Sequence, residues 1–183
     1  MRTSDADILI VPGLFGSEPG HWQSRWEQKL RTARRVHQSD WHNPQRESWT
    51  GAVSDAVAAA ERPVILIAHS LGVHAIAHAA GAFEPGRVVG GFLVAPPSEE
   101  VLRSFDRRNT GFEVAPRGPL PFPSLLVASR NDPYGSYEAS EDLAFAWGSA
   151  LVDAGEAGHI NVESGHGPWP EGLMSLAAFL SKL

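Results

Sequence analysis

Cysteine is absent from this chain of 183 residues. Its absence excludes a disulfide scaffold, a thiolate nucleophile and a cysteine-ligated metal site. Long apolar runs are also missing, and none approaches the roughly 20 residues that a membrane-spanning helix needs. Basic residues are few and scattered, with 15 Lys and Arg against 21 Asp and Glu, so the formal net charge is −6. Neither nucleic acid nor an anionic membrane surface is therefore an expected partner.

The N-terminus lacks the apolar segment of a signal peptide, because residues 1–7 are mostly polar and acidic. We therefore expect a soluble, cytoplasmic protein. The remaining composition is ordinary for a globular chain, with 43% hydrophobic and 20% charged residues. The length fits one domain with a sizeable core, so a single domain over residues 1–183 is expected.

Apolar runs of strand length alternate along the chain with segments of helical character. Because these runs are continuous and not interrupted by polar residues, they are typical of strands covered on both faces. Strands are expected at 8–11, 34–38, 64–68, 88–95, 125–129 and 150–152, and helices at 22–31, 48–60, 73–82, 99–105, 137–147 and 173–183. This order predicts an α/β fold of three layers, α/β/α, around a mostly parallel sheet of about six strands.

The segment Ala68-His69-Ser70-Leu71-Gly72 follows one of these apolar runs and precedes a helical segment. A serine flanked by small residues at such a reversal has the form of a nucleophile elbow, which exposes the hydroxyl at the end of the strand. The first position of the G-x-S-x-G pattern is Ala68; alanine adds a single methyl group, and we expect it to be tolerated. The alternative interpretation is a serine that caps a helix.

Serine needs a base, and the base needs an orienting acid. In doubly wound hydrolases the three groups follow in the chain order serine, acid, histidine. Asp132 is the acid candidate because it directly follows an expected strand, although Asp-Pro is also a common turn initiator. The other acids considered follow the preceding strand, and two of them suit the negative first turn of a helix: Glu99, Glu100 and Asp106.

Two histidines compete for the role of base. His159 lies a few residues beyond the last expected strand, whereas His166 lies further on, between two glycines. A base must be within hydrogen-bond reach of serine and acid, on a loop at the carboxyl ends of the strands. The pattern favours His159 and leaves His166 open as a residue of the pocket rim.

An oxyanion hole needs two donors. We expect the N–H groups of Leu71, next to the serine, and of Leu14, in the loop after the first strand. That loop has the alternative of simply closing a strand-to-helix turn. Pocket residues are sought in the same loops and beside the elbow, and the candidates are Phe15, Trp41, His69, Tyr134 and Trp169.

Two further features remain. His74 and His78 lie four residues apart on one helix face, but a third ligand and the Glu of a H-E-x-x-H motif are missing, so no metal site is predicted. The Gly/Pro-rich segment 107–123 is either a flap beside the site or a long surface loop, and loop statistics favour the second. No phosphate-binding or dinucleotide motif is present, and no cofactor is expected.

The joint set Val11-Pro12-Gly13, Asp40-Trp41, Ala68 to Gly72, Ser129 to Pro133 and Gly158 to Asn161 resembles the small serine hydrolases related to retinoblastoma-binding protein 9 and the bacterial YdeN proteins. The resemblance covers nearly the whole chain. It implies a minimal α/β-hydrolase fold without a large lid domain. It also implies a triad of Ser70, Asp132 and His159, which raises His159 above His166.

The function expected from these observations is a carboxylesterase acting on small esters through an acyl-serine. An amidase or peptidase with the same triad is one alternative, and a protein-interaction module on a hydrolase scaffold is another. The expected partner is a small-molecule ester or amide, and a protein partner and the oligomeric state are left open.

Overall fold

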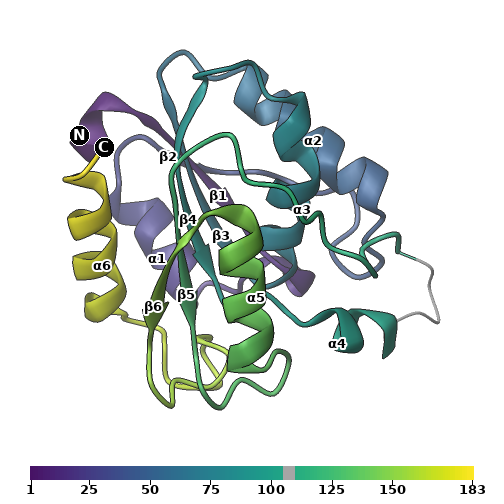
Figure 1. Cartoon of the computed structure of the whole chain (residues 1–183). Helices are drawn as coiled ribbons and strands as arrows, with labels where there is room; N and C mark the ends of the chain where they lie inside the picture. Colours follow the sequence, from purple (N-terminus) through teal and green to yellow (C-terminus); the bar gives the residue numbers. More distant parts are fainter. Residues whose placement is uncertain (105–109) are drawn as a thin grey trace.

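The computed structural model describes residues 1–104 and 110–183 (Figure 1). Six strands form one sheet in the order β2-β1-β3-β4-β5-β6, and every neighbouring pair is parallel. The strands are β1 (Asp7–Val11), β2 (Ala33–Arg35), β3 (Val64–His69), β4 (Val88–Val94), β5 (Ser124–Ala128) and β6 (Ala150–Asp153).

Helices cover both faces of the sheet and complete three layers (Figure 1). One face packs against α1 and α6, and the other against α2, α3 and α5. The helices are α1 (Trp22–Lys29), α2 (Arg46–Ala58), α3 (Leu71–Ala79), α4 (Glu99–Ser104), α5 (Tyr137–Trp147) and α6 (Pro170–Leu180), and short 3-10 turns occur at η1 (Thr3–Asp5), η2 (Leu14–Gly16) and η3 (Ala80–Ala82).

Successive residues of the central strands are buried against opposite layers. In β1, Ile8 and Ile10 join the apolar cluster beneath α1 and α6, whereas Leu9 and Val11 join the cluster beneath α2, α3 and α5. Both faces of such a strand are covered by apolar helix layers, so its residues are apolar at every position and not only at every second one. This explains the continuous apolar runs of the sequence.

The chain reverses its direction of winding between β1 and β3. β2 extends the sheet on one side of β1, and β3 to β6 then extend it on the other side. In open α/β sheets, ligands bind in the crevice outside the carboxyl ends of the strands at this reversal. The two segments that meet there are the loop after β1 and the turn at Ser70 after β3.

The expected strands and helices are all present, with shifted ends. The third helix begins at Leu71 and not at 73, because the elbow passes directly into helical turns. The last helix begins at Pro170 and not at 173, since proline is well suited to the first turn of a helix. The helix expected at 99–105 extends to Ser104 within the described residues.

The segment 107–123 is described from residue 110 onward, and residues 107–109 lie outside the described part of the chain. Residues 110–123 contain neither helix nor strand, in agreement with a loop. This part is anchored by Phe112, Ala115 and Phe122, which are buried in the cluster beneath α2, α3 and α5. Across the described ranges, no helix is long and apolar enough to cross a membrane.

The contact between α3 and β1 should make Gly72 indispensable for stability. A Cβ atom at Gly72 would overlap the carbonyl oxygen of Val11 and lie 2.6 Å from that of Pro12. We expect Gly72→Ala to lower the free energy of unfolding by about 2 kcal/mol or more, because backbone atoms cannot yield as a side chain does. Urea unfolding followed by tryptophan fluorescence measures this change.

Gly51→Ala is the matched control, since Gly51 lies within α2 and its added methyl would meet nothing within 4 Å. This change should raise the free energy of unfolding by about 0.5–1 kcal/mol, through the better helix propensity of alanine. Equal effects of the two substitutions would contradict the proposed role of the contact.

Candidate active site

Ser70 occupies a strained turn between β3 and α3, with φ 55° and ψ −128°. A non-glycine residue with positive φ is uncommon and costs energy, and such strain concentrates at functional sites. The turn is held from both sides: the Ser70 N–H donates to Val94 O at 2.9 Å, and Gly72 packs against the end of β1. Ala68 is fully buried in β3, so the extra methyl at the first motif position is accommodated.

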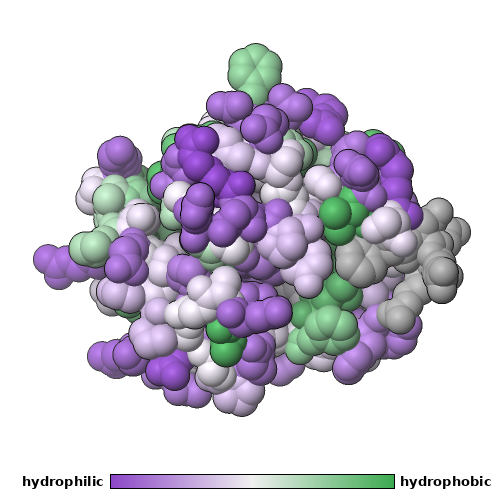
Figure 2. Space-filling model, turned by 90° about the horizontal axis from the view of Figure 1, so that it is seen from below, coloured by the Kyte–Doolittle hydropathy of each residue, from purple (hydrophilic) through white to green (hydrophobic). Residues whose placement is uncertain are grey.

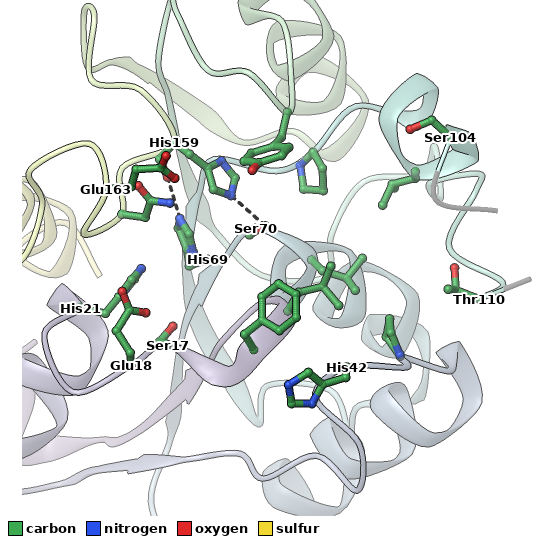
Figure 3. A pocket seen from close by; sticks show the side chains of 18 residues that line it. Ser17, Glu18, His21, His42, His69, Ser70, Ser104, Thr110, His159 and Glu163 are labelled. Atoms are coloured by element: carbon green, nitrogen blue, oxygen red, sulfur yellow. Dashed lines mark hydrogen bonds between the residues drawn. The ribbon is translucent and has the colours of Figure 1, made fainter. Parts of the chain in front are cut away.

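The structure brings Ser70, His159 and Asp132 together from three separate loops. Figure 3 shows the first two of these side chains and the hydrogen bond between them. His159 Nε2 lies 3.0 Å from Ser70 Oγ, and His159 Nδ1 lies 2.9 and 3.0 Å from the two carboxylate oxygens of Asp132. The carboxylate can only accept, so Nδ1 carries the proton and Nε2 of the neutral ring is left to accept from the serine hydroxyl. His159 and Asp132 have side chains that are 9% and 3% exposed.

Further hydrogen bonds hold the loops that carry Asp132 and His159 together. Asn131 Oδ1 accepts from the Gly158 N–H at 2.7 Å and from the Ser129 hydroxyl at 2.9 Å. Ser129 Oγ in turn accepts from the Ala157 N–H at 3.0 Å. These bonds fix the loop after β5 to the loop after β6. Sequence reasoning missed both side chains, although Asn131 stands next to the predicted acid.

The Asp132 carboxylate is oriented within its own loop. The Tyr134 N–H donates to Asp132 Oδ1 at 2.9 Å, and the Tyr134 ring contacts His159 edge-on at 4.6 Å between centroids. The bond from the Tyr134 N–H forms the Asx turn that an Asp-Pro sequence favours. The turn interpretation and the acid interpretation of Asp132 are therefore compatible.

The loop after β1 lies against the elbow. A Cβ atom at Gly13 would be 2.7 Å from Ser70 Cβ and 3.1 Å from the Leu71 nitrogen, so only glycine allows this approach. Leu71 is the first residue of α3, and its N–H has no acceptor within the helix. In the loop, the Phe15 N–H donates to Trp41 O, whereas Leu14 borders the cavity beside Ser70. The two predicted donors are thus on facing segments.

The loop after β1 also contains strained residues, and the Arg35 side chain stabilises their conformation. Phe15 and Ser17 have φ values of 66° and 53°. The Arg35 guanidinium donates to the carbonyl oxygens of Gly16 and Ser17, and it pairs with the Glu27 carboxylate at 2.8 Å. Arg35 therefore stabilises a backbone conformation that most residues avoid. The sequence provided no signal for this contact.

Two buried histidines adjoin the triad. The ring of His69 lies 4.7 Å from that of His159 and 4.8 Å from that of His21. Burial lowers the pKa of His69 well below its ordinary value and that of His21 to about 3. Both rings therefore stay neutral at ordinary pH.

A cavity of about 610 Å³ opens beside Ser70 at the carboxyl ends of the strands. Figure 2 views the molecule from this end and shows apolar side chains gathered on one part of a mostly hydrophilic face. Of the pocket residues predicted from the sequence, Phe15, His69 and Tyr134 line the cavity. Phe15 is 69% exposed at its rim.

Trp169 and Trp41 were predicted as pocket residues but do not line this cavity. Trp169 is 6% exposed and packs in the core between α1 and α6, with its ring stacked on that of Trp26. Trp41 packs edge-on against Trp49, and its ring lies against Gly16 in the loop after β1. Trp169 is therefore part of the core, and Trp41 supports the loop after β1 through its contact with Gly16.

The other candidate residues lie elsewhere. The imidazole of His166 contacts Ser164 and Trp169. Glu99 pairs with Arg103 and Arg117, and Glu100 is exposed on α4, whereas Asp106 lies outside the described residues. His74 is buried, and its Nε2–H donates to Pro97 O at 2.8 Å. Among the described residues, no group of three His, Asp or Glu side chains is arranged to hold a metal ion.

A parallel six-stranded sheet between two helical layers, with a serine at the turn after β3, defines an α/β-hydrolase fold. Within the described ranges no large lid domain is inserted. The chain belongs to the serine hydrolase family, whose profile matches residues 8–178. No curated protein matches it.

Solved structures agree with this assignment. A YdeN-like hydrolase from Pectobacterium atrosepticum is 38% identical, with a TM-score of 0.85, and the match covers 97% of this chain and 91% of that one. The ydeN gene product of B. subtilis is 22% identical, with a TM-score of 0.80 and coverage of 96% and 99%. Thermogutta terrifontis esterase 2 is 16% identical, with a TM-score of 0.70 and coverage of 100% and 85%. The resemblance to YdeN-related hydrolases is confirmed; the last two structures support the fold alone.

The pH dependence of stability should carry the signature of His74. Burial lowers the pKa of this imidazole from 6.5 to about 4. Above about pH 6.5 the group is neutral in both states and contributes no slope. Between about pH 6.5 and about pH 4 only the unfolded chain binds the proton. As the pH falls through this range, the free energy of unfolding therefore decreases by up to about 1.4 kcal/mol per pH unit for this group.

Urea unfolding across this range measures the slope, to which the lowered pKa values of His21 and His69 add with the same sign. His74→Asn should make the slope shallower by about 1 kcal/mol per pH unit. A slope that stays the same in this variant would contradict the account.

Proposed function

We propose that this serine hydrolase is an acyl hydrolase, most simply a carboxylesterase that cleaves small esters. The observation that carries the proposal is the unbroken hydrogen-bond path from Ser70 Oγ through His159 to Asp132. In the proposed roles, Ser70 is the nucleophile, His159 the general base and Asp132 the group that orients and stabilises the imidazolium.

In the proposed reaction, Ser70 Oγ attacks the ester carbonyl carbon while its proton passes to His159 Nε2. The N–H groups of Leu14 and Leu71 stabilise the oxyanion. The carbon–oxygen bond to the alcohol then breaks, and the alcohol takes the proton from His159. A water molecule, deprotonated by the same nitrogen, attacks the acyl-serine and releases the acid. No cofactor enters these steps.

The cavity supports an ester substrate of modest size. Apolar side chains line much of it, which suits an acyl chain, and these are Leu14, Phe15, Pro44, Leu71, Pro97 and Leu102. An amidase would use the same groups on a poorer leaving group, so the ester is the simpler substrate. A pure interaction module would not need the serine, base and acid to be aligned. The single-domain organisation and the cytoplasmic location remain predictions from the sequence.

The role of Ser70 predicts its covalent labelling. A fluorophosphonate probe should modify the wild-type protein, and Ser70→Ala should abolish labelling because it removes the hydroxyl that attacks the phosphorus atom. Intact-mass spectrometry and in-gel fluorescence measure the adduct, and circular dichroism checks that the variant is folded. Labelling of Ser70→Ala at the wild-type rate would reject the assignment.

The two histidines should differ sharply in kinetic effect. His159→Ala should lower kcat for p-nitrophenyl butyrate by about 10³-fold or more, since it removes the group that accepts the serine proton. His166→Ala is the matched control and should change kcat less than about tenfold, because its ring contacts Ser164 and Trp169 instead of Ser70. A loss confined to the His166 variant would reverse the assignment.

A further inference from the structure

The cavity beside Ser70 has two chemically different ends (Figure 3). The apolar end is formed mainly by Leu14, Phe15, Pro44, Leu71, Pro97 and Leu102, together with His42, Ser104 and Thr110. The other end is polar, and it is formed by Ser17, Glu18, His21, His69, Asn161 and Glu163. The described residues that line the cavity include no lysine and no arginine. The kind of ligand that fits the polar end depends on which of its atoms have a proton or a lone pair that is not already in a hydrogen bond.

Ser17 offers lone pairs and not its proton. Gln23 Nε2 donates to the carbonyl oxygens of Val11 and Ile67 at 3.3 and 3.2 Å, which fixes the orientation of this fully buried amide. Gln23 Oε1 must therefore accept, and it accepts the Ser17 hydroxyl proton at 2.7 Å. Ser17 is 8% exposed, and its hydroxyl oxygen can only accept a hydrogen bond from a ligand, because its proton is already donated to Gln23.

His69 is fixed in the same sense. Its Nε2 lies 2.8 Å from the carbonyl oxygen of His159, and a carbonyl oxygen can only accept. Nε2 therefore carries the proton of the neutral ring, and Nδ1 has a free lone pair. Among the described residues Nδ1 has no hydrogen-bond partner. His69 is only 5% exposed, and it borders the cavity next to Ser70.

Two carboxylates complete this end. Glu18 and Glu163 are exposed at its rim, on either side of His21 and His69 in Figure 3. In residues 1–104 and 110–183, neither carboxylate forms an ion pair. Burial keeps the pKa of His21 at about 3, so this ring adds no positive charge. Its Nδ1 accepts from the Gln23 N–H at 3.1 Å, so Nε2 carries the proton, and this N–H has no acceptor among the described residues. Asn161 supplies a side-chain amide, whose Oδ1 accepts from the Ser164 N–H at 3.0 Å.

We infer that the polar end binds a protonated amine of the substrate, with hydrogen bonds to His69 Nδ1 and Ser17 Oγ and charge compensation from Glu18 and Glu163. An ammonium group can donate to both of these acceptors, and no lysine or arginine among the described residues lines the cavity to repel it. The His21 Nε2–H and the amide NH2 of Asn161 are donors, and they are left for an acceptor atom of the same substrate. This inference rests on the proposed esterase function and names its substrate class.

The amine belongs to the alcohol portion of the ester. His159 must lie next to the leaving oxygen to return a proton to it, and its ring is 4.7 Å from the ring of His69. The polar end is thus on the leaving-group side. The acyl chain then extends toward the apolar end, which begins at Leu14 and Leu71.

The test compares two esters of the same shape. 2-(Dimethylamino)ethyl butyrate carries a protonated amine at neutral pH, and 3-methylbutyl butyrate has a CH group in its place. At low salt we expect kcat/KM of the wild type to favour the cationic ester by about fivefold or more, and the preference to shrink at high salt. The ratio is compared within each protein, so it is independent of the active fraction.

The double variant Glu18→Gln/Glu163→Gln should bring this ratio close to one. Glu84→Gln is the matched control, because Glu84 is exposed in the turn before β4 and does not line the cavity. It should keep the wild-type ratio. A wild-type ratio near one, or a preference that survives in the double variant, would overturn the inference.

A second pair, ethyl N,N-dimethylglycinate and ethyl 3-methylbutanoate, moves the amine to the acyl portion. A preference that depends on Glu18 and Glu163 in this pair alone would overturn the placement on the alcohol side. Hydrolysis of both butyrates at equal rates, with Ser70 still labelled by the probe, would reject the amine site and leave the esterase function intact. Loss of labelling and of all turnover would reject the esterase function itself.

Discussion

The contact between the first turn of α3 and the end of β1 is the constraint on which the site depends. Gly72 packs on the carbonyl groups of Val11 and Pro12, and Gly13 packs on Ser70. These two approaches, each possible only without a side chain, place the serine, the start of α3 and the loop after β1 within a few ångström. The rest of the sheet then needs only to deliver the acid and base loops to the same crevice.

Those loops arrive independently, and polar side chains join them. Asn131 and Ser129 connect the segment carrying Asp132 to the segment carrying His159, while His69 holds the His159 carbonyl oxygen from the side of the elbow. The connections made by Ser129 and His69 satisfy buried polar groups that would otherwise be costly, whereas the bond from the Gly158 N–H to Asn131 is exposed. The loop positions are therefore determined by hydrogen bonding as much as by packing.

The sequence predicted the fold and the three proposed catalytic residues because both leave local patterns. Continuous apolar runs mark strands covered on both faces, and a serine between small residues marks the elbow. Trp41 and Trp169 were wrongly assigned to the pocket, since loop residues can face either side and tertiary packing decides which. Arg35, Ser17 and Gln23 left no local pattern, because their roles depend on partners distant in the fold, such as Ile67 for Gln23. Some helices begin a few residues earlier than predicted, because the residues of their first turn carry little apolar pattern; α6, which begins at Pro170, is an example.

A cation beside the base creates an electrostatic conflict that the polar end is arranged to relieve. In the proposed reaction His159 becomes positively charged, and a substrate ammonium nearby would oppose that change. The neutral states of His21 and His69 remove two further sources of repulsion, and both rings are kept neutral by burial. Carboxylates at the rim, Glu18 and Glu163, would offset the ammonium charge. Recognition of an amine and general-base chemistry can therefore share one small cavity, provided that every other ionisable group in it is neutral or negative.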